Sequence, residues 1–328
     1  MDRIAPAAAG DFEEIQRMLE SSYNHYRDFF PQQYPTVWRR AAFDPGNTIL
    51  MRSGGRIVGL VRIFPLDLRQ GPVRLKAAGI GGVATRPELR GRGFMTRLME
   101  RALERMRGDG YPVSVLWGDR FRYRRFGYEQ AGRTLSLRLT ARSLKAAGVT
   151  PAPVRRYLGE PGWLDQVRAA YEKHPFRLRR RPGDYRLIFE KPGLFLFGGG
   201  RGQDFGYLAV TGRGAWQPVE FGGRPETVLA VAAGVMERLG TDSLTFSMAA
   251  GSDGIEAFQS VAAGWSLSSE LMAAVLDLEK TLAIFGRQNP DFKPDPESLA
   301  RLDPAGRTRA LFGLDGPYNL FVWRLDSI

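Results

Sequence analysis

The segment VATRPELRGRGFMTRLME, residues 83–100, places arginines and two glycines directly ahead of an amphipathic helix. The apolar residues of that helix recur at helical spacing, at Met95, Leu98, Met99, Ala102, Leu103 and Met106. A helix N-terminus offers about four unpaired backbone N–H groups and the positive end of the helix dipole. Gly91 and Gly93 leave those groups open to an anion, and Arg90 and Arg92 add positive charge. The residues favour phosphate binding, with a basic turn or a nucleic-acid contact as alternatives.

The residues before and after this segment alternate between helix and strand patterns. We expect a helix over residues 11–26 and a hairpin over residues 47–69 that turns at a Gly-Gly pair. Residues 73–85 continue as extended chain, and residues 113–118 form a short buried strand. A strand, a glycine-rich turn and a helix in this order suit a pyrophosphate. The glycine spacing, however, matches neither a P-loop nor a dinucleotide fingerprint.

The second half of the chain shows the same alternation without the arginine–glycine pattern. We expect helices over residues 162–174, 225–240 and 254–262, with successive strands between residues 193 and 223 and another at residues 243–249. Residues 271–286 read as a strand followed by a helix. Residues 319–328, NLFVWRLDSI, are predicted to form a terminal strand.

Composition narrows the chemistry. The 328 residues are 43% apolar and 25% charged, so there is ample material for about two globular domains. Cysteine is absent, which excludes disulfides and thiolate sites. The chain has only two histidines, His25 and His174, which disfavours a histidine-based zinc site or a catalytic triad. The N-terminus has no apolar signal segment, and no apolar run approaches the roughly 20 residues of a membrane span. We therefore expect a cytoplasmic protein, and its net charge of +12 favours anionic partners.

With these residues in view, VATRPELRGRGF resembles the coenzyme A pyrophosphate loop of the GCN5-related N-acetyltransferase (GNAT) superfamily, whose pattern is R/Q-x-x-G-x-G/A. Arg90 opens the pattern and Gly93 is its central glycine, whereas Met95 replaces the final small residue. In the enhanced-intracellular-survival (Eis-like) branch of the superfamily this position is also large, so Met95 makes the loop similar to that of the branch. The resemblance implies two sets of cofactor contacts. Val83, Ala84 and Thr85 would face the pantetheine arm, and the pyrophosphate would be held by Arg90, Gly91, Arg92, Gly93, Phe94, Met95 and Thr96.

A second segment, YRRFGYEQAG at residues 123–132, resembles the Y-x-R-F-G-Y segment of the same branch. The resemblance implies that Tyr123 is the general acid that protonates the departing thiolate. A tyrosine pKa of about 10 lies near that of a thiol, so the transfer needs little driving force. The alternative is that the aromatic residues of this segment are core residues. Gly118 and Asp119 fall where the branch contacts the acyl end of the cofactor, and Asp119 could accept a proton or cap the next turn.

The resemblance implies an α/β (α+β) fold of tandem GNAT-like domains, each a mixed, mostly antiparallel sheet flanked by helices. We expect a catalytic domain at residues 1–135 and a second, cofactor-free GNAT-like domain at residues 136–270. Residues 271–328 would be a short C-terminal extension, an abbreviated sterol-carrier-like region or tail. Full-length members of the branch use the C-terminal carboxylate in catalysis, which here would be that of Ile328.

The expected reaction moves an acetyl group from acetyl-coenzyme A to the primary amine of a small molecule or peptide, by direct attack and without a metal. The aromatic segment at residues 23–40 would line the acceptor site through Tyr26, Phe29, Phe30 and Trp38, or these residues could simply pack a helix pair. Three alternatives remain: a larger acyl or aminoacyl donor, a non-catalytic coenzyme A binder, and a nucleic-acid binder, which is the least favoured because no nucleic-acid motif appears. We expect no membrane partner, and the sequence is compatible with a homo-oligomer.

Overall fold

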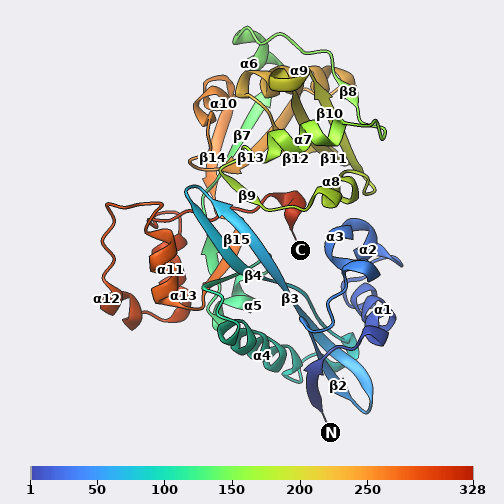
Figure 1. The fold of residues 1–328 in the computed structure, drawn as a ribbon, viewed down its shortest axis with the longest axis vertical. Helices are drawn as coiled ribbons and strands as arrows, with labels where there is room; N and C mark the ends of the chain where they lie inside the picture. Colours follow the sequence, from blue (N-terminus) through green and yellow to red (C-terminus); the bar gives the residue numbers. More distant parts are fainter. Residues whose placement is uncertain (1, 328) are drawn as a thin grey trace.

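The computed structural model describes residues 2–327, which form two lobes, each built on its own β-structure (Figure 1). The first lobe holds an eight-stranded sheet in the order β1-β2-β3-β4-β5-β15-β6, with β9 pairing to β3. The strands are β1 Arg3–Pro6, β2 Thr48–Ser53, β3 Arg56–Gln70, β4 Val73–Thr85, β5 Val113–Leu116, β6 Glu129–Ala131, β9 Phe176–Leu178 and β15 Leu271–Val275. The hairpin and the extended segment that the sequence predicts are β2, β3 and β4.

Helices cover both faces of this sheet, because its central strands bury side chains on each side. On one face lies α4, Phe94–Gly108, whose predicted apolar stripe is buried at Leu98, Met99, Ala102, Leu103 and Met106. Burying each of the leucine and methionine side chains in this stripe contributes about 1.5–3 kcal/mol. The opposite face is covered by six helices, α1 Phe12–Tyr23, α2 Phe29–Gln33, α3 Pro35–Trp38, α11 Leu278–Phe285, α12 Pro296–Arg301 and α13 Pro304–Phe312.

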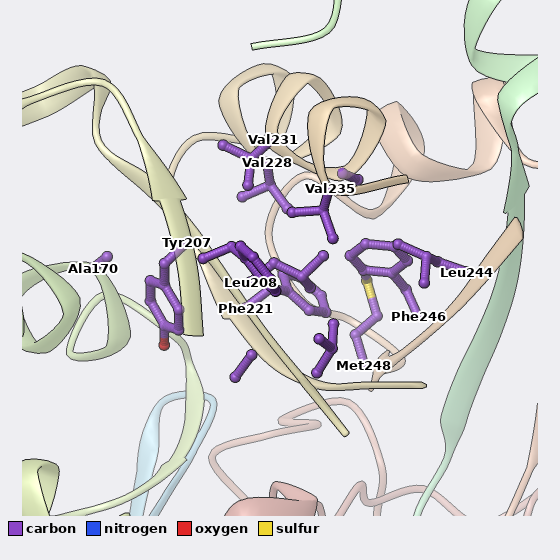
Figure 2. Close-up of a cluster of buried hydrophobic side chains, with 14 of the residues drawn as sticks. Ala170, Tyr207, Leu208, Phe221, Val228, Val231, Val235, Leu244, Phe246 and Met248 are labelled. Atoms are coloured by element: carbon purple, nitrogen blue, oxygen red, sulfur yellow. The ribbon is translucent and has the colours of Figure 1, made fainter. Parts of the chain in front are cut away.

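The second lobe joins a four-stranded sheet, β12-β11-β10-β8, to a three-stranded sheet, β13-β7-β14. Its elements are β7 Thr134–Thr140, α6 Ala141–Ala146, β8 Arg155–Arg156, α7 Trp163–Tyr171, α8 Pro182–Phe189, β10 Leu194–Gly199, β11 Gly206–Arg213, β12 Ala215–Gly222, α9 Pro225–Leu239, β13 Ser243–Ala249, α10 Ile255–Val261 and β14 Gly264–Ser268. Figure 2 shows its core, where valines of α9 face Phe221 of β12 and Phe246 of β13. The order β12, α9, β13 repeats the order β4, α4, β5 of the first lobe.

The two lobes exchange strands. β7 follows β6 in the chain but pairs with β13 and β14 of the second lobe. β15 follows β14 but enters the first sheet, where it is antiparallel to both β5 and β6. The strand and helix predicted over residues 271–286 are confirmed as β15 and α11. The strand β15, which falls in the predicted C-terminal extension, belongs to the first sheet.

The predicted terminal strand at residues 319–328 is wrong, since residues 319–323 have no strand partner and residues 324–326 form a 3-10 turn. Side chains replace a neighbouring strand. The Gln70 amide accepts from Phe321 N at 2.8 Å and donates to Phe321 O at 2.9 Å, as a paired strand residue would. Gln288 likewise accepts from Asn319 N and donates to Asn319 O. The apolar pattern of this segment reflects burial between the two lobes, where the last described residues lie (Figure 1).

Candidate active site

The loop between β4 and α4 has an open backbone at its two glycines. A 3-10 turn at Pro87–Leu89 leads into Gly91, with φ of 79°, and Gly93, with φ of 75°. Both values lie in the left-handed region that disfavours other residues. A Cβ at either glycine would meet nothing within 4 Å, so these positions also keep the space before the helix free.

The helix that follows the loop presents free amides. α4 begins at Phe94, and Arg97 N donates to Gly93 O at 3.2 Å. The N–H groups of the residues between them have no partner within the helix. Together with the helix dipole, these groups attract an anion to the open space at Gly91 and Gly93.

Three arginines surround this helix end. Arg90 and Arg92 are exposed, and Arg90 Nη2 donates to Ser22 O at 3.1 Å. The guanidinium of Arg92 lies 5.7 Å from the Phe94 ring centroid. Arg125 donates to Thr96 Oγ1 at 2.9 Å and thereby brings the second motif to the first. Sequence reasoning missed Arg125, although it lies inside the YRRFGY segment.

β4 separates from β5 just ahead of this loop. The two strands are parallel and pair at Ala78 with Ser114 and at Gly79 with Val115. β5 ends at Leu116, whereas β4 continues to Thr85. The predicted cofactor residues Val83, Ala84 and Thr85 therefore extend past the last residue that β5 pairs. Tyr23 already donates its hydroxyl to Val83 O at 2.9 Å.

A β-bulge marks the separation. β4 residues Gly82 and Val83 together lie opposite Val61 of β3, because the pairing register shifts there. Gly82 has φ of 59°, and a Cβ on it would lie 2.7 Å from Trp38 Cη2. The indole of Trp38 thus rests directly on the bulge. Gly82 was not singled out from the sequence, although a Gly-Gly pair inside a strand is a signal for a bulge.

Tyr123 lies at the end of α5, Arg120–Tyr123, and is 7% exposed. Its ring packs on the backbone of Gly118, where a Cβ would lie 2.4 Å from Tyr123 Cε2. The ring of Tyr128 meets it edge to face at 6.2 Å. Burial raises the pKa of Tyr123, and the positive charge of Arg122 opposes that effect. The hydroxyl consequently stays protonated at neutral pH.

Asp119 caps the turn that carries Tyr123. Its Oδ1 accepts from Arg122 N at 2.8 Å, so of the two roles that the sequence left open the structure supplies the cap. Phe126 and Tyr128 are buried in the same core as α4, in line with the core alternative for these two aromatics.

A cavity of about 500 Å³ opens beside Tyr123, which we call the acceptor cleft. Of the residues predicted to line an acceptor site, Phe29, Phe30 and Trp38 do so. Tyr26 is not among the lining residues, since it is 50% exposed and its hydroxyl bonds to Gln32 and Gln33. Tyr34, from the same predicted aromatic segment, is also a lining residue. The structure adds lining residues that sequence reasoning missed, namely Tyr23, His25, Trp117, Glu270 and Arg324.

The C-terminal tail reaches the same cleft. Ser327 is a lining residue, and Ile328, the predicted catalytic terminus, lies outside the described residues. Asp326 anchors the tail, because its Oδ1 accepts from Arg180 Nε at 2.7 Å and its Oδ2 from the Tyr171 hydroxyl at 2.7 Å. Arg180 also pairs with Glu220, and the side chains of these three ions are at most 1% exposed.

Comparisons with known proteins show what the first lobe and the fold are similar to. Residues 3–131 match the family model described as an acetyltransferase (GNAT) domain. An uncharacterized N-acetyltransferase of Streptomyces coelicolor is 34% identical over 129 residues, which are 37% of this chain and 31% of that protein. The matched region thus spans about a third of the length of that relative.

Two solved structures show similarity over both lobes. A GCN5-related N-acetyltransferase from Kribbella flavida is 21% identical, with a TM-score of 0.65 over 87% of this chain and 74% of that chain. Eis1 from Mycobacterium abscessus is 18% identical, with a TM-score of 0.61 over 86% of this chain and 76% of that chain. The chain therefore has the α/β fold of tandem GNAT-like domains that was expected. None of the helices in residues 2–327 is long and apolar enough to cross a membrane.

Proposed function

We propose that this chain, whose residues 3–131 match the acetyltransferase (GNAT) domain model, transfers an acetyl group from acetyl-coenzyme A to a primary amine. One observation carries the proposal. The free amides at the start of α4, the two left-handed glycines and three arginines adjoin the point where β4 leaves β5. A pyrophosphate suits the helix end, and an extended pantetheine arm suits the unpaired edge of β4 at Val83, Ala84 and Thr85.

In this proposal the reaction is a direct acyl transfer. The amine nitrogen attacks the thioester carbonyl, an oxyanion forms, and the C–S bond breaks as the thiolate leaves. Backbone N–H groups of β4 beyond its pairing with β5 would stabilise the oxyanion. Tyr123 would protonate the sulfur, which its raised pKa permits because the hydroxyl keeps its proton.

A group that accepts the proton of the attacking ammonium is still required. Asp119, a chain of waters and the carboxylate of Ile328 are the candidates. The capping bond to Arg122 N engages Asp119, which weakens its case. Ser327 lines the acceptor cleft, whereas Ile328 lies outside the described residues.

We further propose that the second lobe, residues 136–270, binds no coenzyme A. Its counterpart of the glycine loop is only Gly223 and Arg224, between β12 and Pro225 at the start of α9. Proline has no N–H to offer an anion. The side chain of Pro225 also lies against Gly254, where a Cβ would meet it at 2.3 Å.

Calorimetric titration with acetyl-coenzyme A tests the donor site. We expect micromolar binding by the wild-type chain and its loss in the double variant Arg90→Ala/Arg92→Ala. The matched control is Arg101→Ala/Arg105→Ala, which removes the same charge from α4 beyond the loop, at residues paired with Glu104 and Asp109. An absence of binding by the folded wild-type chain, or equal losses in both double variants, would contradict the assignment of the loop.

A further inference from the structure

The acceptor cleft contains a single carboxylate among its described lining residues, that of Glu270. Glu270 lies between β14 and β15, at the point where the chain crosses from the second lobe into the first sheet. Its side chain has no hydrogen bond or ion pair within residues 2–327. The carboxylate is thus available to a ligand in the cleft.

The neighbouring carboxylates are already engaged. Asp119 caps α5, and Glu129 accepts from Arg120 Nε at 2.5 Å and from Arg124 Nε at 3.3 Å. Asp326 is held by Arg180. Among the described residues that line the cleft, Glu270 supplies the one carboxylate, and it can receive a cation without breaking an existing pair.

Much of the lining of the cleft is aromatic. The rings of His25 and Phe29 stack with centroids 3.6 Å apart, and Phe30 meets Trp38 edge to face at 5.6 Å. Trp38 is in turn fixed against Arg62, whose guanidinium lies 4.9 Å from the indole centroid. Such a rigid wall favours a flat or apolar ligand body, and its ring faces also attract positive charge.

Positive charge limits how many charges the ligand can carry. Arg324 of the tail is exposed and lines the same cleft, and the chain has a net charge of +12. A polycation would meet this charge with one carboxylate to offset it, so a polyamine or an aminoglycoside is disfavoured.

We infer that the acceptor is a primary amine with one positive charge on an aromatic or apolar body, and that Glu270 binds its ammonium group as it enters the cleft. This inference rests on the proposed function. In the transfer, the ammonium first loses a proton to the general base. The amine nitrogen then attacks the carbonyl carbon, which forms the N–C bond and the oxyanion. As the oxyanion collapses, the C–S bond breaks and Tyr123 protonates the departing thiolate, and the second proton of the attacking nitrogen is released and restores the Tyr123 hydroxyl.

The experiment compares 2-phenylethylamine with spermine as acceptors, with thiol release from acetyl-coenzyme A as the readout. We expect kcat/KM for 2-phenylethylamine to exceed that for spermine at least tenfold. In Glu270→Gln we expect KM for 2-phenylethylamine to rise about tenfold, while kcat and the affinity for acetyl-coenzyme A change little. Glu256→Gln is the matched control, because Glu256 is an exposed glutamate of α10 outside the cleft.

A direct measurement accompanies the kinetics. Titration of 2-phenylethylamine into the chain saturated with coenzyme A should give a dissociation constant about tenfold weaker in Glu270→Gln than in Glu256→Gln, at unchanged thermal stability. If spermine is preferred, if no amine of this class is acetylated by a chain that binds acetyl-coenzyme A, or if Glu270→Gln behaves as the control, the inference is wrong. If the wild-type chain does not bind acetyl-coenzyme A, it is the proposed function that fails.

Discussion

Tyr123 is positioned by the groups it packs against. The backbone of Gly118 lies under its ring, the Tyr128 ring meets its edge, and the cap of Asp119 fixes the turn that carries it. A ring held in this way keeps its hydroxyl in one place, and the Arg122 side chain interacts with the same hydroxyl. This placement suits a group that must give its proton to the leaving sulfur.

Tyr123→Phe tests the proposed acid. We expect turnover to fall by roughly 10²–10⁴-fold, the usual range for loss of a general acid, while acetyl-coenzyme A binds as before. Burial raises the pKa of Tyr123 above its ordinary value of about 10, so the protonated donor persists to that pH and any decline of kcat due to its ionisation lies above it. Turnover of Tyr123→Phe equal to that of the wild type would remove Tyr123 from the mechanism.

His174 makes the stability of the second lobe depend on pH. Burial lowers its pKa to about 4, and its Nε2 lies 2.7 Å from Phe221 O. The unfolded chain, with a histidine pKa of about 6.5, takes up the proton first as the pH falls. The stabilisation is therefore complete above about pH 6.5 and is lost as the pH falls from there towards 4. Between pH 7 and 5 we expect the free energy of unfolding to drop by about 1–2 kcal/mol more in the wild type than in His174→Gln. Urea unfolding at both pH values measures this, and parallel drops would contradict it.

Among the candidate site residues, those that lie in a recognisable local sequence pattern could be predicted from the sequence. The loop glycines, Tyr123 and the aromatics Phe29, Phe30 and Trp38 lie in recognisable segments. Glu270 and Arg324 lie in segments with no pattern of their own, and they reach the cleft because the fold returns distant parts of the chain to it. No spacing rule could have found them.

The bulge of β4 links an element to the shape of the cleft. An ordinary β4 would alternate its side chains evenly, whereas the extra residue at Gly82–Val83 turns the end of the strand away from its regular register. Trp38 of α3 fills the space that the missing side chain of Gly82 leaves. The strand end and the aromatic wall are therefore fixed by one contact.

The variant Gly82→Ala should disturb both the end of β4 and the position of Trp38. A left-handed alanine costs roughly 1–2 kcal/mol, and overlap with Trp38 adds about 1–3 kcal/mol, so we expect a clear loss of thermal stability. kcat/KM for the amine should fall because Trp38 must move. Gly183→Ala in α8 is the control, since its Cβ would meet nothing within 4 Å and its φ is not positive. Equal behaviour of the two variants would show that the bulge has no such role.

Elements with strong internal periodicity were predictable. α4 and α9 follow from their apolar spacing and their end signals. The terminal segment was predicted as a strand because its residues are apolar and β-prone, yet its backbone groups bond to Gln70 and Gln288 side chains. A distant amide that imitates a neighbouring strand leaves no trace in the local sequence.

At the scale of the whole molecule, Arg180, Glu220 and Asp326 join the tail to the second lobe. Arg180 lies just beyond β9 and Glu220 on β12, and Asp326 belongs to the tail that lines the acceptor cleft. Breaking a buried ion pair by removing one partner costs about 3–5 kcal/mol, because the other charge stays buried. The tail position therefore depends on the second lobe, although the arginine–glycine loop between β4 and α4 lies in the first lobe.

The variant Asp326→Asn should separate the proposed binding of the amine, which needs the tail, from the proposed binding of acetyl-coenzyme A, which does not. We expect lower thermal stability and a higher KM for the amine, since Arg324 and Ser327 lose their anchor, with acetyl-coenzyme A affinity unchanged. Asp315→Asn, at an exposed aspartate before the tail, should leave all three quantities unaltered. An unchanged amine KM in Asp326→Asn would mean that the tail needs no anchor to complete the cleft.

The tandem architecture could be anticipated from the recurring order of elements, but the exchange of β7 and β15 could not. The sequence of a short strand does not identify its partner strand, because pairing is decided by the hydrophobic faces and the register of the whole sheet. The boundaries at residues 135 and 270 remain a proposal about sequence units, and in space the first sheet includes a strand from beyond the second boundary.

The position of β15 has a consequence for how the chain is made. A ribosome completes residues 1–131 before the strand that joins β5 to β6 has been synthesised. At about 5–20 residues per second, the stretch between them takes roughly 7–30 s. During that interval the nascent first lobe exposes two unpaired strand edges, which invite wrong partners and chaperones. The first lobe, which holds the proposed donor site, thus completes its sheet only after the strands of the second lobe up to β14 have been synthesised.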